Sequence, residues 1–76
     1  MAEYRYTVLF EPVPEGGYHV TVPALPEICT FGETLEEARE MAADAIKCVL
    51  ESMQEDHEQI PPDVQPARET LAVTLV

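Results

Sequence analysis

The sequence has 76 residues and is 46% hydrophobic, so it is long enough for one small domain and too apolar for a disordered chain. Fifteen acidic residues face only four basic ones, which gives a net charge of -11 at pH 7. This charge argues against direct nucleic-acid binding, because contact with a polyphosphate requires Lys and Arg to displace its counterions. An acidic surface suits a basic protein partner, or it serves only to keep the chain in solution.

The sequence shows no sign of membrane insertion or secretion. No apolar run reaches the roughly 20 residues of a membrane span, and the first residues lack the basic and then apolar pattern of a signal peptide. We therefore expect a soluble cytoplasmic protein. In that compartment Cys29 and Cys48 are expected to be reduced and packed as small apolar side chains, since they lack the number and spacing of a disulfide framework or a zinc site.

Two strands are predicted in the first third of the sequence. Residues 4–11 alternate in polarity, and the aromatic and apolar side chains of one face are Tyr4, Tyr6, Val8 and Phe10. These tyrosines are expected in the core rather than on a binding surface. Prolines and glycines reverse the chain over residues 12–17, and residues 18–22 alternate again, so the two strands are expected to be antiparallel.

A third short strand is predicted over residues 28–31, and a long helix follows it. Thr34 and Glu37 have the spacing of a capping box, which predicts a helix that begins at Leu35. The apolar residues then recur at i, i+3, i+4 and i+7 as one stripe, namely Leu35, Ala38, Met41, Ala42, Ala45, Ile46, Val49, Leu50 and Met53. The stripe ends near residues 55–58, and Pro61 and Pro62 prevent a continuation.

Residues 70–76 alternate once more, which predicts a terminal strand. The predicted fold class is therefore α+β, as a single domain over residues 1–76 in the order β-β-β-α-β. It has a three-to-four-stranded, mainly antiparallel sheet with one long helix packed on one face. The other face has no covering element, and the apolar residues expected there are Leu9, Ala72 and Val76, with Ile28 or Cys29.

An uncovered apolar face and an unpaired sheet edge both indicate contact with other molecules. We predict a homo-oligomer, most simply a two-fold dimer, because pairing between copies satisfies the open edge. The acidic surface adds a basic protein as a second partner. The candidate partner-binding residues are Leu9, Glu11, Glu15, His19, Glu27 and Val76.

Catalysis is not indicated, and no cofactor, metal or catalytic residue is assigned. A nuclease of the RNase H type needs several carboxylates that converge on two divalent metal ions. Glu11, Glu15 and Glu27 would have to be brought together by the turns, while the remaining carboxylates lie on the outward face of the helix, in loops and at strand ends. His19 and His57 each lack a nucleophile or second ligand nearby in the pattern.

Two segments of the sequence carry a resemblance to a known family. Residues 17–26 read Gly-Tyr-His-Val-Thr-Val-Pro-Ala-Leu-Pro, and residues 30–38 read Thr-Phe-Gly-Glu-Thr-Leu-Glu-Glu-Ala. In this order and spacing they resemble the HicB antitoxins of toxin-antitoxin pairs, and the resemblance continues through Ile60-Pro61 to the final strand. The sequence departs from the family pattern at Ala24, where an acidic residue is common, and at Glu27-Ile28, where a Gly-Cys pair is common.

The resemblance implies a partly degraded RNase H-like fold that binds and blocks HicA, a small basic toxin that cleaves messenger RNA. It also implies a short form without a DNA-binding domain, because members that repress their own operon carry such a domain after the last strand and this sequence stops at Val76. Two alternatives remain open. One is a stand-alone oligomeric HicB-like protein without a toxin partner, and the other is a metal-dependent RNase H-like nuclease.

Overall fold

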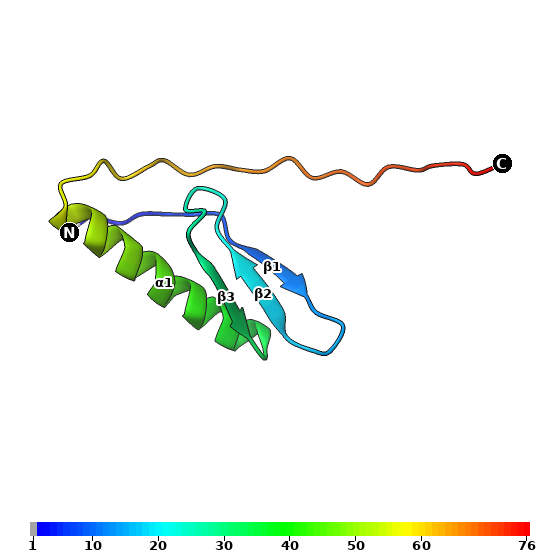
Figure 1. Cartoon of the computed structure of the whole chain (residues 1–76), viewed down its shortest axis with the longest axis horizontal. Coiled ribbons are helices and arrows are strands. Elements are labelled where there is room, and N and C mark those ends of the chain that lie inside the picture. The colour runs from blue at the N-terminus through cyan, green and yellow to red at the C-terminus, as the bar shows by residue number, and fades with distance from the viewer. Residues whose placement is uncertain (1) are drawn as a thin grey trace.

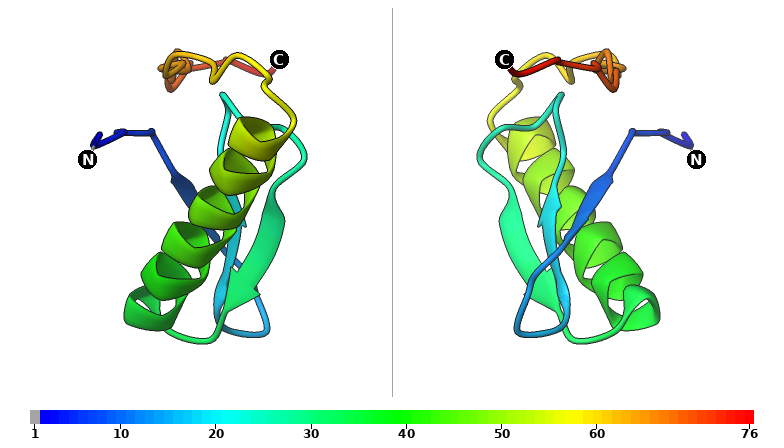
Figure 2. Two further views of the ribbon diagram at one scale, coloured as in Figure 1. Left: turned by 90° about the vertical axis from the view of Figure 1, so that its left-hand side faces the viewer. Right: turned by 90° about the vertical axis from the view of Figure 1, so that its right-hand side faces the viewer.

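Three antiparallel strands and one helix make up the folded part of the chain. The computed structural model describes residues 2–76. The strands are β1 (Leu9–Pro12), β2 (Tyr18–Thr21) and β3 (Cys29–Gly32), arranged in the order β1-β2-β3. The helix α1 (Leu35–Glu55) crosses one face of this sheet, as Figures 1 and 2 show. The predicted α+β class is therefore confirmed, with a sheet of three strands.

A tight turn at residues 13–17 joins β1 to β2. The Gly16 N–H donates to the carbonyl of Val13 at 2.8 Å, and the Val13 N–H donates to the carbonyl of Gly17 at 3.0 Å. Gly17 has a φ of +88°, which glycine adopts without the steric cost that a Cβ brings. A Cβ at this position would also meet the Phe31 ring. The turn and the packing of β3 beside it therefore both require glycine.

The helix begins where the capping pattern predicted. Thr34 is the N-cap, and its Oγ accepts a hydrogen bond from the Glu37 N–H at 3.0 Å. The helix ends at Glu55, close to the predicted end of the apolar stripe. Just before the helix, Gly32 approaches it so closely that an added Cβ would meet the backbone of Ala38. A glycine here lets β3 lie against the first turn of α1.

The core lies between α1 and the inner face of the sheet. Its buried side chains are Val20, Val22, Leu25, Ile28, Ala38, Ala42 and Leu50. Two of them, Leu25 and Ile28, come from the loop between β2 and β3. Backbone hydrogen bonds from Leu25 to Val22 (2.9 Å) and from Ile28 to Leu25 (3.0 Å) curl this loop over the core. Ile28 and Cys29 were alternatives for the uncovered face of the sheet, and Ile28 is excluded from it because the loop turns its side chain inward.

Several other apolar residues are more exposed than the stripe predicted. Leu35 is 36% exposed because it is the first residue of α1, and Met41 is 41% exposed because it lies on the flank of the stripe. Cys29 and Cys48 are free thiols, as expected, but both are exposed and neither is packed in the core. Cys29 lies on the outer face of the sheet, and Cys48 lies on the helix face that points away from it.

The ends of the chain differ most from the prediction. The first strand was predicted over residues 4–11, but only Leu9–Pro12 pairs with a neighbour, and residues 4–8 continue without a strand partner. The terminal strand is not formed, and residues 58–76 run as an extended tail along and then past the body (Figure 1). The alternation of residues 70–76 is present in the sequence, yet none of the strands described for residues 2–76 pairs with it. Within residues 2–76, α1 is not apolar enough over its length to cross a membrane.

Candidate protein-interaction site

Three of the six candidate residues lie together on the sheet face that α1 leaves uncovered. The strand register sets two rows of side chains across this face, Leu9–Thr21–Cys29 and Glu11–His19–Phe31. The rings of His19 and Phe31 meet edge to face, with centroids 5.8 Å apart and an interplanar angle of 71°. We call these six residues the outer face. It combines an exposed aromatic side chain with one carboxylate and one imidazole.

The other three candidate residues are spread over the molecule. Glu15 lies in the turn between β1 and β2 and borders a shallow hollow that Phe31 and Glu33 also line. Glu27 lies in the loop between β2 and β3, which is at the opposite end of the sheet from that turn. Val76 lies in the exposed tail, away from the sheet (Figure 1). Glu15 therefore lies beside Phe31 of the outer face, and Val76 lies away from that face.

The suggested convergence of Glu11, Glu15 and Glu27 is not found. Consecutive antiparallel strands place their two connecting loops at opposite ends of the sheet, so Glu15 and Glu27 are held apart. Among residues 2–76, no three His, Cys, Asp or Glu side chains come close enough to hold a metal ion. The described part of the chain therefore does not provide the metal site that the nuclease alternative requires.

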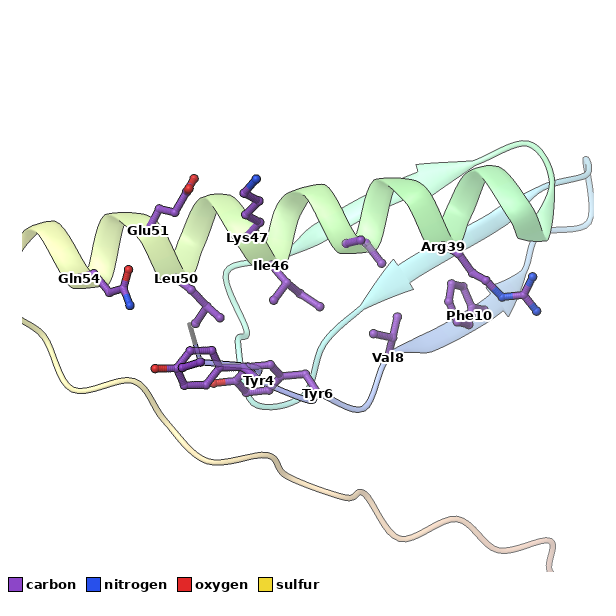
Figure 3. A pocket seen from close by; sticks show the side chains of 13 residues that line it. Tyr4, Tyr6, Val8, Phe10, Arg39, Ile46, Lys47, Leu50, Glu51 and Gln54 are labelled. Carbon is purple, nitrogen blue, oxygen red and sulfur yellow. The ribbon is translucent and has the colours of Figure 1, made fainter.

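A larger hollow lies on the opposite side of the sheet, and the sequence analysis did not single it out. It is a groove of about 880 Å³ between residues 4–10 and one flank of α1 (Figure 3). Its apolar walls include Tyr6, Val8 and Phe10 from the N-terminal segment and Ile46 and Leu50 from the helix. The alternation of residues 4–10 had assigned these aromatic side chains to a closed core. They do face α1, but the helix lies over β2 and β3 and leaves this side open.

The rim of the groove is unusual for so acidic a chain. Arg39 and Lys47 lie along it, two helical turns apart, and they are two of the four basic residues of the whole sequence. In Figure 3 the Arg39 side chain extends from α1 toward Phe10, whereas the Lys47 side chain points away from the tyrosines. The sequence does contain a sign of this rim, since Arg39, Ala43 and Lys47 follow one another at intervals of four residues beside the apolar stripe. It identifies a helix flank but does not show that the flank borders a groove.

The first part of the tail is fastened beside this groove. The Tyr6 hydroxyl donates to the carbonyl of Pro61 at 2.5 Å. The Thr7 N–H and the Thr7 hydroxyl donate to the two carboxylate oxygens of Asp63, each at 2.8 Å. These bonds from Thr7 hold the pKa of Asp63 below its usual value, while partial burial, with the nearby Tyr4 and Asp63, raises the pKa of Tyr6. We call this set of contacts the tail anchor.

Comparison with known proteins gives the family of the chain. A family model described as "HicB_like antitoxin of bacterial toxin-antitoxin system" matches residues 6–72, which run from the segment before β1 into the tail. The chain belongs to the HicB-like antitoxin family. The match includes the outer face, the tail anchor and most of the residues that line the groove.

Individual relatives include two proteins named as HicB antitoxins and one with a different name. "Antitoxin HicB 1" of Photorhabdus laumondii is 54% identical over 57 residues, which cover 75% of this chain and 37% of that protein. "Antitoxin HicB" of Escherichia coli K12 is 47% identical over 57 residues, covering 75% of this chain and 41% of that protein. A UPF0150 protein of Synechocystis is 40% identical over 58 residues, covering 76% of this chain and 73% of that protein.

The HicB-like chain thus spans about two fifths of the length of the HicB antitoxins that it matches. Membership of the family supports an antitoxin role.

Proposed function

We propose that this chain is the toxin-binding part of an antitoxin, and that it neutralises a small, basic toxin of the HicA type that cleaves messenger RNA. The family and the names of its relatives support the antitoxin role. We further propose that it does so in the cytoplasm as a homo-oligomer. Catalysis and direct contact with nucleic acid are no part of this proposal.

The observation that carries the proposal is the exposed negative charge. Fifteen Asp and Glu side chains face four Lys and Arg, and no charged side chain is buried among residues 2–76. The whole excess therefore acts on solvent and on approaching molecules. An RNA-cleaving enzyme needs a basic surface to hold its substrate. An acidic protein that covers this surface competes with the RNA for it. Charge of opposite sign also speeds the encounter.

Within this acidic surface, we propose the outer face and Glu15 as the contact region. An interface commonly has an apolar or aromatic centre and a polar rim. Leu9 and the exposed ring of Phe31 supply such a centre, while Glu11 and Glu15 supply carboxylates beside it. His19, whose ring meets that of Phe31 edge to face, lies between Glu11 and Phe31.

The test uses a basic protein encoded beside this chain as the binding partner. Its affinity for the full chain is measured by calorimetry at several salt concentrations. We expect binding that weakens as salt rises, since exposed charges are screened beyond about 8 Å at physiological ionic strength. The double variant Glu11→Gln/Glu15→Gln should weaken binding by about tenfold, which corresponds to about 1.4 kcal/mol.

A matched control removes the same charge elsewhere. Glu40 and Glu51 lie on the exposed side of α1, away from the outer face. The variant Glu40→Gln/Glu51→Gln should change the affinity by less than about threefold, because only the long-range field is reduced. Equal losses in the two variants would show that the outer face is not the contact region. Affinity without any dependence on salt would remove the electrostatic basis of the proposal.

A second candidate function is a stand-alone oligomer without a toxin. It is favoured by the Synechocystis relative, which this chain covers over most of its length and which is named a UPF0150 protein rather than an antitoxin. The two candidates are distinguished by the neighbouring reading frame. If the neighbouring frame encodes a small basic protein with a histidine on a β-strand, the antitoxin function is supported. The lack of such a neighbour supports the stand-alone oligomer.

A further inference from the structure

We propose that residues 70–76 of one copy of this chain add as a fourth strand to the open edge of β1 in a second copy, where they close the groove beside α1. The inference rests on the self-association proposed above and gives it a specific surface. It makes no use of the toxin.

The tail contains a strand sequence that pairs with no other segment of residues 2–76. Leu71, Val73 and Leu75 are 73%, 79% and 90% exposed, although they alternate with smaller residues as strand residues do. Residues 70–76 also carry no charged side chain in a protein whose net charge is -11. An uncharged, apolar and extended segment readily pairs with a sheet edge, and local charge repulsion does not oppose that contact.

The acceptor edge is β1. This strand pairs with β2 on one side, and among residues 2–76 no strand pairs with its other side. The groove opens on the same side of the sheet. One of its walls includes Val8 and Phe10 from the N-terminal segment, and the other includes Ile46 and Leu50 from the helix. A strand added to β1 presents alternate side chains to the groove at a spacing of roughly 7 Å. The apolar side chains of the tail have this spacing, at Leu71, Val73 and Leu75. They would supply the apolar wall that is missing on the open side of the groove.

The length and composition of the connector favour a second copy as the acceptor. The tail anchor fixes Asp63 at Thr7, and six extended residues, 64–69, reach roughly 20 Å from there. The edge from Thr7 to Pro12 spans only roughly 17 Å. Residue 70 therefore starts beyond the end of its own β1, and the tail runs past the body in this way in Figure 1.

Return to the same β1 would need a tight reversal within residues 64–69. This stretch reads Val-Gln-Pro-Ala-Arg-Glu, and it has no Gly, Asn or Asp for a turn position with positive φ. Pro66 also stiffens it. Reaching a second molecule needs no reversal, and a two-fold axis lets each tail fill the edge of the other copy.

The test compares two variants of the full chain that add the same charge to the tail. Leu71→Glu/Leu75→Glu places carboxylates on the side of the segment that enters the groove. Ala72→Glu/Thr74→Glu places them on the opposite side. Sedimentation velocity at tens of micromolar should give twice the 8.5 kDa mass for the wild type and the second variant, and 8.5 kDa for the first. The tail is exposed, so far-UV circular dichroism should show the same fold in all three proteins.

Amide hydrogen exchange at two concentrations then locates the contact. Backbone amides of residues 70–76 and the amide of Phe10 should be protected at tens of micromolar and should lose this protection on dilution to monomer. A wild type that stays at 8.5 kDa overturns both the self-association and this inference. A dimer that survives Leu71→Glu/Leu75→Glu overturns only the inference. Protection that persists in the diluted monomer means that the tail pairs with its own β1, which also overturns it.

Discussion

Replacement of Leu25 by Ala tests the most unexpected feature of the core, which is a loop side chain buried at its centre. Leu25 is 0% exposed and is the largest of the fully buried side chains. A Leu→Ala change at such a site removes transfer free energy and leaves a cavity, and it typically costs about 2 to 5 kcal/mol. We expect about 3 to 4 kcal/mol for Leu25→Ala, since the core is fully closed around it. For a protein of 76 residues this is a large share of a total stability of roughly 4 to 11 kcal/mol.

Two comparison variants set the scale. Ile46 packs against the same cluster but is only half-buried, because it lines the open groove, so Ile46→Ala should cost about 1 to 2 kcal/mol. Leu35 is about one-third exposed at the start of α1, and Leu35→Ala should cost less than about 1 kcal/mol. The predicted order of destabilisation is therefore Leu25, then Ile46, then Leu35.

The assay is urea unfolding at one fixed protein concentration, because self-association stabilises the folded state by mass action. A thermal melt gives a second reading, since 1 kcal/mol shifts the midpoint by roughly 4 to 8 °C in a domain of this size. If Leu35→Ala destabilises the protein as much as Leu25→Ala does, the burial described for the loop between β2 and β3 is incorrect. A midpoint loss below about 4 °C for Leu25→Ala leads to the same conclusion.

Three further predictions follow from the cap, the tail anchor and the dispersed carboxylates. Thr34→Ala should cost about 1 kcal/mol in urea unfolding through loss of the helix cap, and no loss would show that the bond to Glu37 is not formed in solution. The pKa of Asp63 lies below its usual value in the folded protein. The contact with Thr7 therefore stabilises the folded protein at pH values above the usual pKa of Asp, and this contribution is lost as the pH falls through the lowered pKa. The Thr7 amide shift in NMR should report this acid transition, and Asp63→Asn should abolish it. Purified protein should cleave no RNA with Mg²⁺ or Mn²⁺, and cleavage that disappears in Glu11→Gln would contradict this expectation.

The parts of the fold that the sequence predicts well are those set by local chemistry. The helix could be placed to within a residue or two, because a cap at Thr34 and a long apolar stripe act within neighbouring turns. The turn at Gly16 and Gly17 is local in the same sense, since both have positive φ. Alternation also identified which side of the first strand faces the helix, with Val8 and Phe10 packed against the core.

The parts that could not be predicted depend on neighbours far away in the sequence. Residues 70–76 alternate as a strand does, yet a strand exists only where another strand pairs with it, and in the described part of the chain none does so. Leu25 is flanked by Ala24 and Pro26, so no periodicity marks it as a core residue. The groove arises because α1 lies over β2 and β3 rather than over β1, and the apolar stripe of the helix does not determine that offset.

The candidate site shows the same division. Leu9, Glu11 and His19 could be grouped from strand alternation and antiparallel pairing, and the register places them on one face. Glu27 and Val76 could not be placed, because their positions depend on the direction of a loop and of a tail.

The most direct test of the proposed function is a titration of the neighbouring basic protein with this chain in an RNA-cleavage assay. Messenger RNA, the basic protein and increasing amounts of the full acidic chain are combined, first at physiological salt and then in separate titrations at higher salt. Cleavage should stop at a simple whole-number ratio of the two proteins, and more of the chain should be required as the salt concentration is raised. Cleavage that continues unchanged in the presence of a large excess of the chain would contradict the proposal that it is an antitoxin for this partner.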